Sequence, residues 1–173
     1  MLMDGVIFSI VEFQHVKPGK GGAFVRTKLK NVETGAVLDR TFRSGDKVDQ
    51  IRLEKREVQF LYSEGDTYHF MDMQTYDQTA VEVDVVGDGS KLLKENEMVS
   101  LLVARERTIG VELPNFVELK VARTEPGVKG NTATGAVKPA TLETGAVVQV
   151  PLFVNESDTL KVDTRTGEYV ERV

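Results

Sequence analysis

Hydrophobic and polar residues alternate along most of the chain with a period of two, the spacing that puts successive side chains on opposite faces of a β-strand. In residues 23–30 a mostly apolar set alternates with a mostly basic set, so we expect a half-buried strand there. One helical turn is expected at residues 90–94. Many short strands predict an all-β chain built as a sandwich or as barrels. Further strands are expected at residues 6–14, 38–42, 58–63, 67–71, 81–86, 98–104, 117–123, 146–150, 160–163 and 168–172.

Two pairs of these strands are joined by short turns and are expected to form hairpins. Glu64-Gly65-Asp66 follows the strand at 58–63, and Arg165-Thr166-Gly167 joins the last two strands. The pentapeptide Glu-Thr-Gly-Ala-Val occurs at residues 33–37 and again at 143–147. Since no fixed period accompanies this match, it indicates a shared strand–turn–strand solution and not a repeat architecture.

Charge is distributed unevenly along the 173 residues. The chain carries 22 Lys and Arg against 27 Asp and Glu, a net charge of −5, which argues against a uniformly basic nucleic-acid coat. Residues 1–51 have 8 basic and 6 acidic side chains, residues 52–114 have 7 and 13, and residues 115–173 have 7 and 8. The charge shift near residue 51 and the proline at position 114 predict three domains with these bounds.

Composition narrows the function classes. The chain has no cysteine, which excludes disulfides, thiolate metal sites and a cysteine nucleophile. It contains no phosphate-binding GxxxxGK[ST] loop, no zinc-ligand spacing and no nucleophile elbow, so we expect no enzyme, no cofactor and no metal site. No apolar stretch reaches the length of a membrane span, and no basic leader opens the chain. These features predict a cytoplasmic protein without membrane contact.

The most informative segment runs from residue 14 to residue 30, with five basic residues and no acidic one. Its centre reads Lys17-Pro18-Gly19-Lys20-Gly21-Gly22. Proline stiffens the approach, and the three glycines remove side chains that would shield Lys20 or hold it down. Such a hairpin tip presents one long cation that fits a narrow, negatively charged crevice. The alternative, which the spacing leaves open, is a glycine-rich turn with a solvated lysine.

Residues 11–21, VEFQHVKPGKG, resemble the lysine loop of the elongation factor P family, bacterial translation factors related to archaeal and eukaryotic initiation factor five A. Further segments are similar to the third domain of that family: PNFVEL, KPATLETGA, VPLFV and VDTRTGEYV, all between residues 114 and 170. Together these segments cover nearly the whole chain in the family's order. On this resemblance the chain is identified as a member of the family.

The resemblance implies three small β-barrels, an SH3-like (KOW-type) N-terminal domain followed by two OB-fold domains, in an L-shaped arrangement that mimics tRNA. It also implies a monomeric factor that binds the ribosome beside the peptidyl-tRNA and promotes peptide-bond formation at stalling sequences such as consecutive prolines. Lys20 falls on the tip residue that orients the CCA end of the tRNA. Many family members carry an enzymatically lengthened lysine there, so a lysine-modifying enzyme is a further candidate partner.

The alternative function is a general single-stranded RNA-binding OB-fold protein with no role at the peptidyl-transferase centre. Such proteins use aromatic stacking platforms. Only 7% of the residues are aromatic and tryptophan is absent, which counts against this alternative, though weakly.

Three groups of residues are candidates for RNA contact. Arg26, Lys28 and Lys30 share one strand face beside the loop, and they either line the tRNA backbone or form a solvated face. By the resemblance, Tyr169 and Arg172 fall on positions that touch tRNA, and packing is the alternative for Tyr169. We expect a packing or hydrogen-bonding role for His15 and assign no site to His69.

The third group, Gly130-Asn131-Thr132, aligns with the family loop that carries Gly-Asp-Thr and reads the exit-site mRNA codon. Asparagine keeps an acceptor and adds donors, so base contact survives in principle, but a preference that depends on the carboxylate is not expected to carry over. The alternative is an asparagine that simply suits a turn.

Family members usually begin further upstream than the segment that matches Met3-Asp4-Gly5, with an opening strand of the first barrel. We expect a start codon placed too late in this sequence. The alternative is a first domain that closes with fewer strands and leaves an unpaired edge near residues 6–11.

Overall fold

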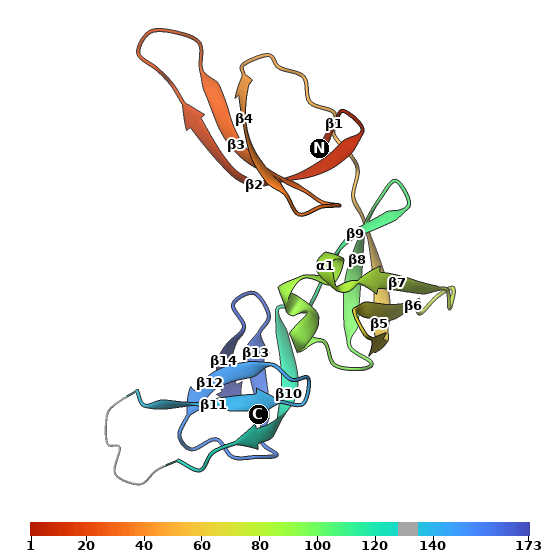
Figure 1. Cartoon of the computed structure of the whole chain (residues 1–173), viewed down its shortest axis with the longest axis vertical. Helices are drawn as coiled ribbons and strands as arrows, with labels where there is room; N and C mark the ends of the chain where they lie inside the picture. The colour runs from red at the N-terminus through yellow and green to blue at the C-terminus, as the bar shows by residue number, and fades with distance from the viewer. Residues whose placement is uncertain (128–134) are drawn as a thin grey trace. The chain divides into compact units, whose positions relative to one another are not determined.

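The computed structural model describes residues 1–127 and 135–173. Strands dominate these residues and form three curled sheets (Figure 1), which confirms the all-β prediction. The chain divides into two compact units, one made of residues 1–56 and 101–110 and the other of residues 57–100 and 111–173. The domain bounds near residues 51 and 114 and the L-shaped arrangement stay predictions.

The first sheet has the strand order β1-β2-β3-β4. Its core contains Ile7, Phe8 and Leu29, and the buried Thr27 hydroxyl donates a 2.8 Å hydrogen bond to the carbonyl oxygen of Arg40. Because buried polar groups need a partner, this bond ties β3 to β4 at its centre. The strands are β1 (Leu2–Met3), β2 (Val6–Val16), β3 (Phe24–Asn31) and β4 (Val37–Arg43).

The short strand β1 was not predicted. Asp4 and Gly5 have φ values of 51° and 80° and turn the chain so that β1 pairs with Val6 and Ile7 of β2. Both positive φ values are typical of a two-residue hairpin turn. The alternative given above, an unpaired edge near residues 6–11, is therefore wrong at its first two positions, which pair with β1, while the expected late start codon stays a prediction.

The second sheet has the order β7-β6-β5-β8-β9. Its core is built from alternate residues of these strands, among them Phe60, Phe70 and Leu101. Its elements are β5 (Glu54–Glu64), β6 (Thr67–Asp72), β7 (Gln78–Glu82), β8 (Met98–Ala104) and β9 (Arg107–Glu112), with the short helices α1 (Val83–Val86) and η1 (Asp88–Leu92) between β7 and β8.

The strand predicted at residues 81–86 is wrong over residues 83–86. β7 ends at Glu82, which pairs with Thr67, the first residue of β6, so no partner strand continues beyond this point. The chain instead turns into α1, where the Gly87 amide donates a 2.9 Å hydrogen bond to the Val83 carbonyl oxygen. The helical turn predicted at residues 90–94 is present as η1, which begins two residues earlier.

The third sheet has the order β12-β11-β10-β13-β14, and its outer strands β12 and β14 contact each other, so the sheet nearly closes. Its core is fully buried at Leu119, Val150, Val154 and Leu160. This alternation of buried and exposed positions matches the period-two pattern of the sequence. The strands are β10 (Phe116–Thr124), β11 (Val137–Leu142), β12 (Val147–Pro151), β13 (Thr159–Asp163) and β14 (Glu168–Arg172).

β9 and β11 are strands that the sequence did not reveal. Proline removes a donor from a strand ladder, so Pro139 argues against an interior strand. In β11, Pro139 pairs with Gln149 of β12, whereas pairing with β10 starts at Ala140. The proline is therefore tolerated because it lies beyond the end of the second ladder.

Candidate functional site

The lysine loop, defined here as residues 17–23, joins β2 to β3. Val16 and Phe24 form the last pair of the hairpin, and every residue of the loop is exposed. Figure 1 shows the loop extending beyond the ends of both strands. The predicted hairpin tip is therefore present, with Lys20 close to its centre.

The three glycines of the loop differ in what the backbone demands. Gly21 has a φ of 127°, a conformation that side chains with a Cβ rarely adopt. Gly19 and Gly22 lie outside the left-handed region, and a Cβ built on either would meet no atom within 4 Å. The fold therefore needs glycine at position 21 and gives no reason for glycine at positions 19 and 22.

The cations of the loop have no partner among the described residues. Within residues 1–127 and 135–173, neither Lys17 nor Lys20 has a hydrogen bond or ion pair. A lysine ammonium carries three donors on a flexible four-carbon stem. Lys20 can therefore direct its full charge and all its donors to a partner outside the chain.

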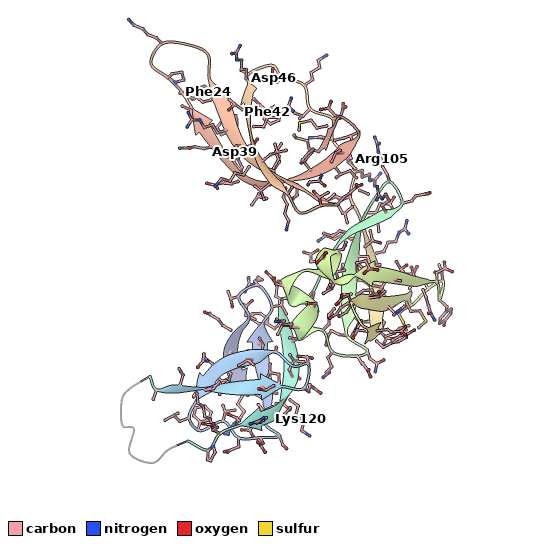
Figure 2. All side chains as sticks on the ribbon, in the orientation of Figure 1. Phe24, Asp39, Phe42, Asp46, Arg105 and Lys120 are labelled. Atoms are coloured by element: carbon pink, nitrogen blue, oxygen red, sulfur yellow. The ribbon has the colours of Figure 1, made fainter. Side chains whose placement is uncertain are left out.

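The base of the loop is braced by the turn that follows β4. The Ser44 amide donates a 3.3 Å hydrogen bond to the Ala23 carbonyl oxygen. Asp46 closes this turn, because one of its carboxylate oxygens accepts a 2.7 Å hydrogen bond from the Arg43 amide. Figure 2 labels Asp46, Phe24 and Phe42 at this end of the first sheet. The loop thus projects from a braced base, and in the part of the chain that the structure describes its tip has no such hydrogen bond.

The basic face of β3 is more mixed than the sequence indicated. Arg26, Lys28 and Lys30 are all exposed, and the Arg26 guanidinium carbon lies 5.7 Å from the centre of the Phe24 ring. The Lys28 ammonium nitrogen lies 3.3 Å from a carboxylate oxygen of Glu12, and Asp39 is the cross-strand partner of Lys28 on β4 (Figure 2). Lys28 is therefore partly neutralised, whereas Arg26 and Lys30 have no ion pair among the described residues.

Both histidines make aromatic contacts. The ring of His15 lies 5.9 Å from that of Phe13 in an edge-to-face arrangement, and His69 stacks on Tyr62 at 4.5 Å. Such pairs are stabilising packing contacts. The described residues contain no group of three or more His, Cys, Asp or Glu side chains that could hold a metal ion.

The candidate residues of β14 have different environments. Tyr169 is half-buried and packs against the core of the third sheet, as the packing alternative proposed. Arg172 is exposed, with one guanidinium nitrogen 3.3 Å from an Asp158 carboxylate oxygen and its central carbon 5.1 Å from the centre of the Phe153 ring. The third predicted group, Gly130, Asn131 and Thr132, lies outside the described residues.

Two exposed aromatic residues of the third sheet were missed by the sequence reasoning. Phe153 and Phe116 are 56% and 43% exposed, and each has a cationic side chain within 6 Å of its ring. A signal was available at Phe153, because it is an aromatic residue in the turn after Pro151, the last residue of β12. The arginine over its ring was not predictable, because it comes from β14, which follows later in the chain.

Among the described residues, no helix has the length and apolar character needed to cross a membrane. The arrangement offers exposed cations, aromatic rings and a projecting lysine, with no catalytic constellation among these groups. Such surfaces are typical of proteins that bind nucleic acid through phosphate contacts and stacking.

Comparisons with known proteins place this arrangement in a class of translation factors. Three family models match in order: the elongation factor P KOW-like domain at residues 1–48, the elongation factor P OB domain at residues 53–111, and the elongation factor P C-terminal domain at residues 117–172. The KOW-like and OB matches agree with the predicted fold class. The chain belongs to the elongation factor P family.

Individual relatives agree with the family. The chain is 58% identical over 171 residues to elongation factor P of Pelotomaculum thermopropionicum, covering 99% of this chain and 92% of that protein. It is 57% identical over 170 residues to elongation factor P of Moorella thermoacetica, covering 98% and 92%. Its structure resembles eukaryotic translation initiation factor 5A from Methanococcus jannaschii, with a TM-score of 0.51 and 26% identity over 65% of this chain and 81% of that one. The chain is a translation elongation factor that acts on the ribosome.

Proposed function

We propose that this factor binds beside the peptidyl-tRNA and promotes peptide-bond formation at stalling sequences such as consecutive prolines. In this proposal Lys20 orients the CCA end of the tRNA. The observation that carries the proposal is the design of the lysine loop. Lys20 has no internal partner among the described residues. The fold has room for a side chain at positions 19 and 22, yet both residues are glycine.

Gly19 and Gly22 favour a binding site in which another molecule closely surrounds the lysine loop. A residue that is glycine without a demand from φ or packing gains nothing in the free protein and adds conformational entropy to the unfolded chain. The missing side chains become useful when another molecule closely surrounds the loop. A narrow crevice lined by RNA phosphates and riboses fits both the bare backbone and the free ammonium group.

The mechanism is positioning. Proline is a hindered nucleophile, and a peptidyl chain that ends in proline adopts geometries unfavourable for attack. Holding the reacting groups in alignment can supply up to about 7–11 kcal/mol of a barrier, so recovering a few kcal/mol at a stalled site lies well within reach. The Lys20 ammonium donates hydrogen bonds to phosphate or ribose oxygens, and no proton transfer or covalent step by this chain is required.

The other RNA contacts that we propose are assigned mainly to exposed cationic side chains. Arg26 and Lys30 contact the tRNA backbone, and Lys28 contributes less because Glu12 neutralises it. Arg172 and Tyr169 also contact tRNA; Arg172 is partly neutralised by Asp158, as Lys28 is by Glu12, and Tyr169 contacts tRNA with the part of its side chain that the core does not bury. Residues 130–132 contact the exit-site mRNA codon. We further propose that the factor works as a cytoplasmic monomer and that Lys20 is the site at which a lysine-modifying enzyme would act.

The test is the variant Lys20→Ala in a translation system that reports synthesis through consecutive prolines. We expect the variant to lose the factor's stimulation by about tenfold or more, since a loss of 1.4 kcal/mol is already a factor of ten. Lys17→Ala, on the same exposed loop, is the matched control and retains most of the stimulation. Equal synthesis by Lys20→Ala and the unaltered protein would refute the proposal.

A general single-stranded RNA-binding protein is the second candidate, and the exposed Phe153 with Arg172 is the observation in its favour. The same variant separates the two functions. A general RNA binder would lose little on Lys20→Ala and would stimulate ordinary and proline-rich messages equally.

A further inference from the structure

The loop between β12 and β13, defined here as the β12–β13 loop (residues 152–158), is anchored by burial and by hydrogen bonds. Val154 is fully buried in the core of the third sheet. The Asn155 amide donates a 2.9 Å hydrogen bond to an Asp158 carboxylate oxygen, and the Asn155 side-chain amide donates to the Phe153 carbonyl oxygen at 3.2 Å. The Ser157 amide donates to Val121 of β10 at 3.0 Å. The loop is therefore anchored at several points within the third sheet's own structure.

Phe153 is exposed although the loop that carries it is anchored by a buried valine and by hydrogen bonds. More than half of its side chain, 56%, is accessible to solvent, while its neighbour Val154 is fully buried. Gly127 packs against this loop so closely that a Cβ there would lie 2.7 Å from the Leu152 carbonyl oxygen. The fold thus fixes the backbone on both sides of Phe153 and leaves the ring on the surface.

Arg172 covers part of this ring from β14. Its guanidinium carbon lies 5.1 Å from the ring centre, and one of its terminal nitrogens lies 3.3 Å from Asp158. Hydrogen bonds from the Asn155 amide and from Arg172 lower the pKa of Asp158, so this carboxylate is charged at neutral pH. Asp158 and Phe153 therefore hold the guanidinium in place, and within residues 1–127 and 135–173 some of its five donors have no hydrogen-bond partner.

We propose that Phe153 and Arg172 form a binding site for one unpaired nucleotide of RNA. This role rests on the proposed function, which brings the chain into contact with RNA on the ribosome. The base stacks on the Phe153 ring, and the guanidinium donates to a phosphate or ribose oxygen of the same strand. Asp158 is a positioning residue that orients Arg172. The ring and the planar cation are already arranged, so little side-chain entropy is lost on binding.

The chemistry favours RNA over a protein partner. An aromatic ring takes any base, because every base has a π-face, and a guanidinium fits phosphate oxygens through paired donors. Phe116 offers an internal comparison. Lys161 and Arg165 both lie within 6 Å of its ring, and like Arg172 each forms an ion pair with a carboxylate. Among the described residues, two cations therefore cover the Phe116 ring, whereas one covers the Phe153 ring.

The experiment measures binding of the full-length chain to ribosomes stalled on consecutive prolines, by competition with a fluorescently labelled copy of the unaltered protein. Phe153→Leu keeps the apolar volume and loses the ring, and we expect its Kd to rise about five- to thirtyfold. Phe153→Trp keeps a stacking ring and stays within about twofold of the unaltered protein. Arg172→Lys keeps the charge and loses the planar stack, so its Kd rises about three- to tenfold. Phe116→Leu is the matched control and stays within about twofold.

A photoreactive benzoylphenylalanine at position 153 identifies the partner on the same ribosomes. We expect a cross-linked product that contains RNA, so that treatment with ribonuclease reduces its size. A cross-link only to ribosomal protein, or equal affinities for Phe153→Leu and Phe116→Leu, would overturn the nucleotide site. If Phe153→Leu does not fold, Arg172→Lys and the cross-link decide.

The outcomes for this site and for the proposed function remain separable. If Lys20→Ala retains full stimulation while Phe153→Leu binds weakly, the nucleotide site stands and the proposed function fails. If Lys20→Ala loses stimulation while Phe153→Leu binds normally, the proposed function stands and the nucleotide site fails.

Discussion

The lysine loop and the β12–β13 loop are built in opposite ways. The lysine loop has a braced base, but its tip has no side-chain partner among the described residues, and two of its glycines are not required by the fold. The β12–β13 loop is anchored by a fully buried valine and fixed by several hydrogen bonds. One loop carries a free cation and the other carries a fixed ring.

The two loops are therefore expected to use binding energy differently, one for affinity and the other for the rate of the stalled step. A preorganised surface loses little entropy on binding, so its contacts contribute mainly to affinity. A long lysine without a partner loses side-chain entropy when its target orders it. Its contacts then lower the free energy of the single arrangement of the target that they require. We therefore expect substitutions in the β12–β13 loop to change stability or affinity, and substitutions in the lysine loop, except at Gly21 with its positive φ, to change the rate of the stalled step.

The largest expected effect on stability comes from the anchor of the β12–β13 loop. Val154→Ala removes two methyl groups from a fully buried site, and we expect the free energy of unfolding to fall by about 2–3 kcal/mol. Lys20→Ala, in the lysine loop, changes it by less than about 0.5 kcal/mol. Urea denaturation of both variants measures this. Similar losses in the two variants would remove the contrast between the loops.

The glycines of the lysine loop give the next largest effect. Gly21→Ala places a Cβ at a φ of 127°, and we expect a cost of about 1–2 kcal/mol or a local rearrangement. Gly22→Ala meets open space and leaves the free energy of unfolding within about 0.5 kcal/mol of the original value.

The activity of Gly22→Ala is then informative. We expect this stable variant to stimulate synthesis through consecutive prolines several-fold less than the unaltered protein, because the added methyl group crowds the site that surrounds Lys20. Full stimulation would show that the bare backbone at position 22 serves no purpose in function.

A pH effect is expected for the β12–β13 loop. The pKa of Asp158 is lowered from its ordinary value of 3.8 by the hydrogen bond from the Asn155 amide and by Arg172. A carboxylate whose pKa is lower in the folded state stabilises the protein above its unfolded-state pKa, and this contribution is lost as the pH falls through the folded-state value. Asp158→Asn should therefore be less stable than the unaltered protein at pH 7, and the difference should shrink below pH 3.8. Thermal unfolding across this range checks it, and a difference that does not depend on pH would contradict it.

The smallest effect is expected on the basic face of β3. The ion pair between Lys28 and Glu12 is exposed, so a double-mutant cycle of the two alanine variants should give a coupling of about 0–1 kcal/mol. Lys30→Ala should reduce the salt dependence of ribosome binding more than Lys28→Ala, because Glu12 already neutralises Lys28. Equal salt dependence in the two variants would show that the pairing does not matter on the ribosome.

The sequence predicted most of the strands because a half-buried sheet imposes a period of two. β8 has the bounds that the sequence predicted, residues 98–104. The prediction failed at residues 83–86, where apolar spacing continued but the partner strand had ended. It also missed β11, because the tolerance of Pro139 depends on where the ladder to β10 stops.

The candidate site shows the same limit. The lysine loop was recognisable because glycine, proline and lysine act locally. The acidic neighbours of Lys28 were not foreseen, since Glu12 and Asp39 reach it through the registers of two different strand pairs. The contact between Phe153 and Arg172 was missed for a similar reason, because the two residues meet only in the folded third sheet.

The most direct measurement compares rates of single peptide bonds on purified ribosomes. The rate of proline–proline bond formation and the rate of an ordinary bond are measured with the unaltered protein, with Lys20→Ala and without the factor. We expect the unaltered protein to accelerate the proline–proline step about tenfold or more, and Lys20→Ala to give the rate seen without the factor. The ordinary bond should form equally fast in all three cases. A Lys20→Ala variant that accelerates the proline–proline step as fully as the unaltered protein would contradict the central role of Lys20.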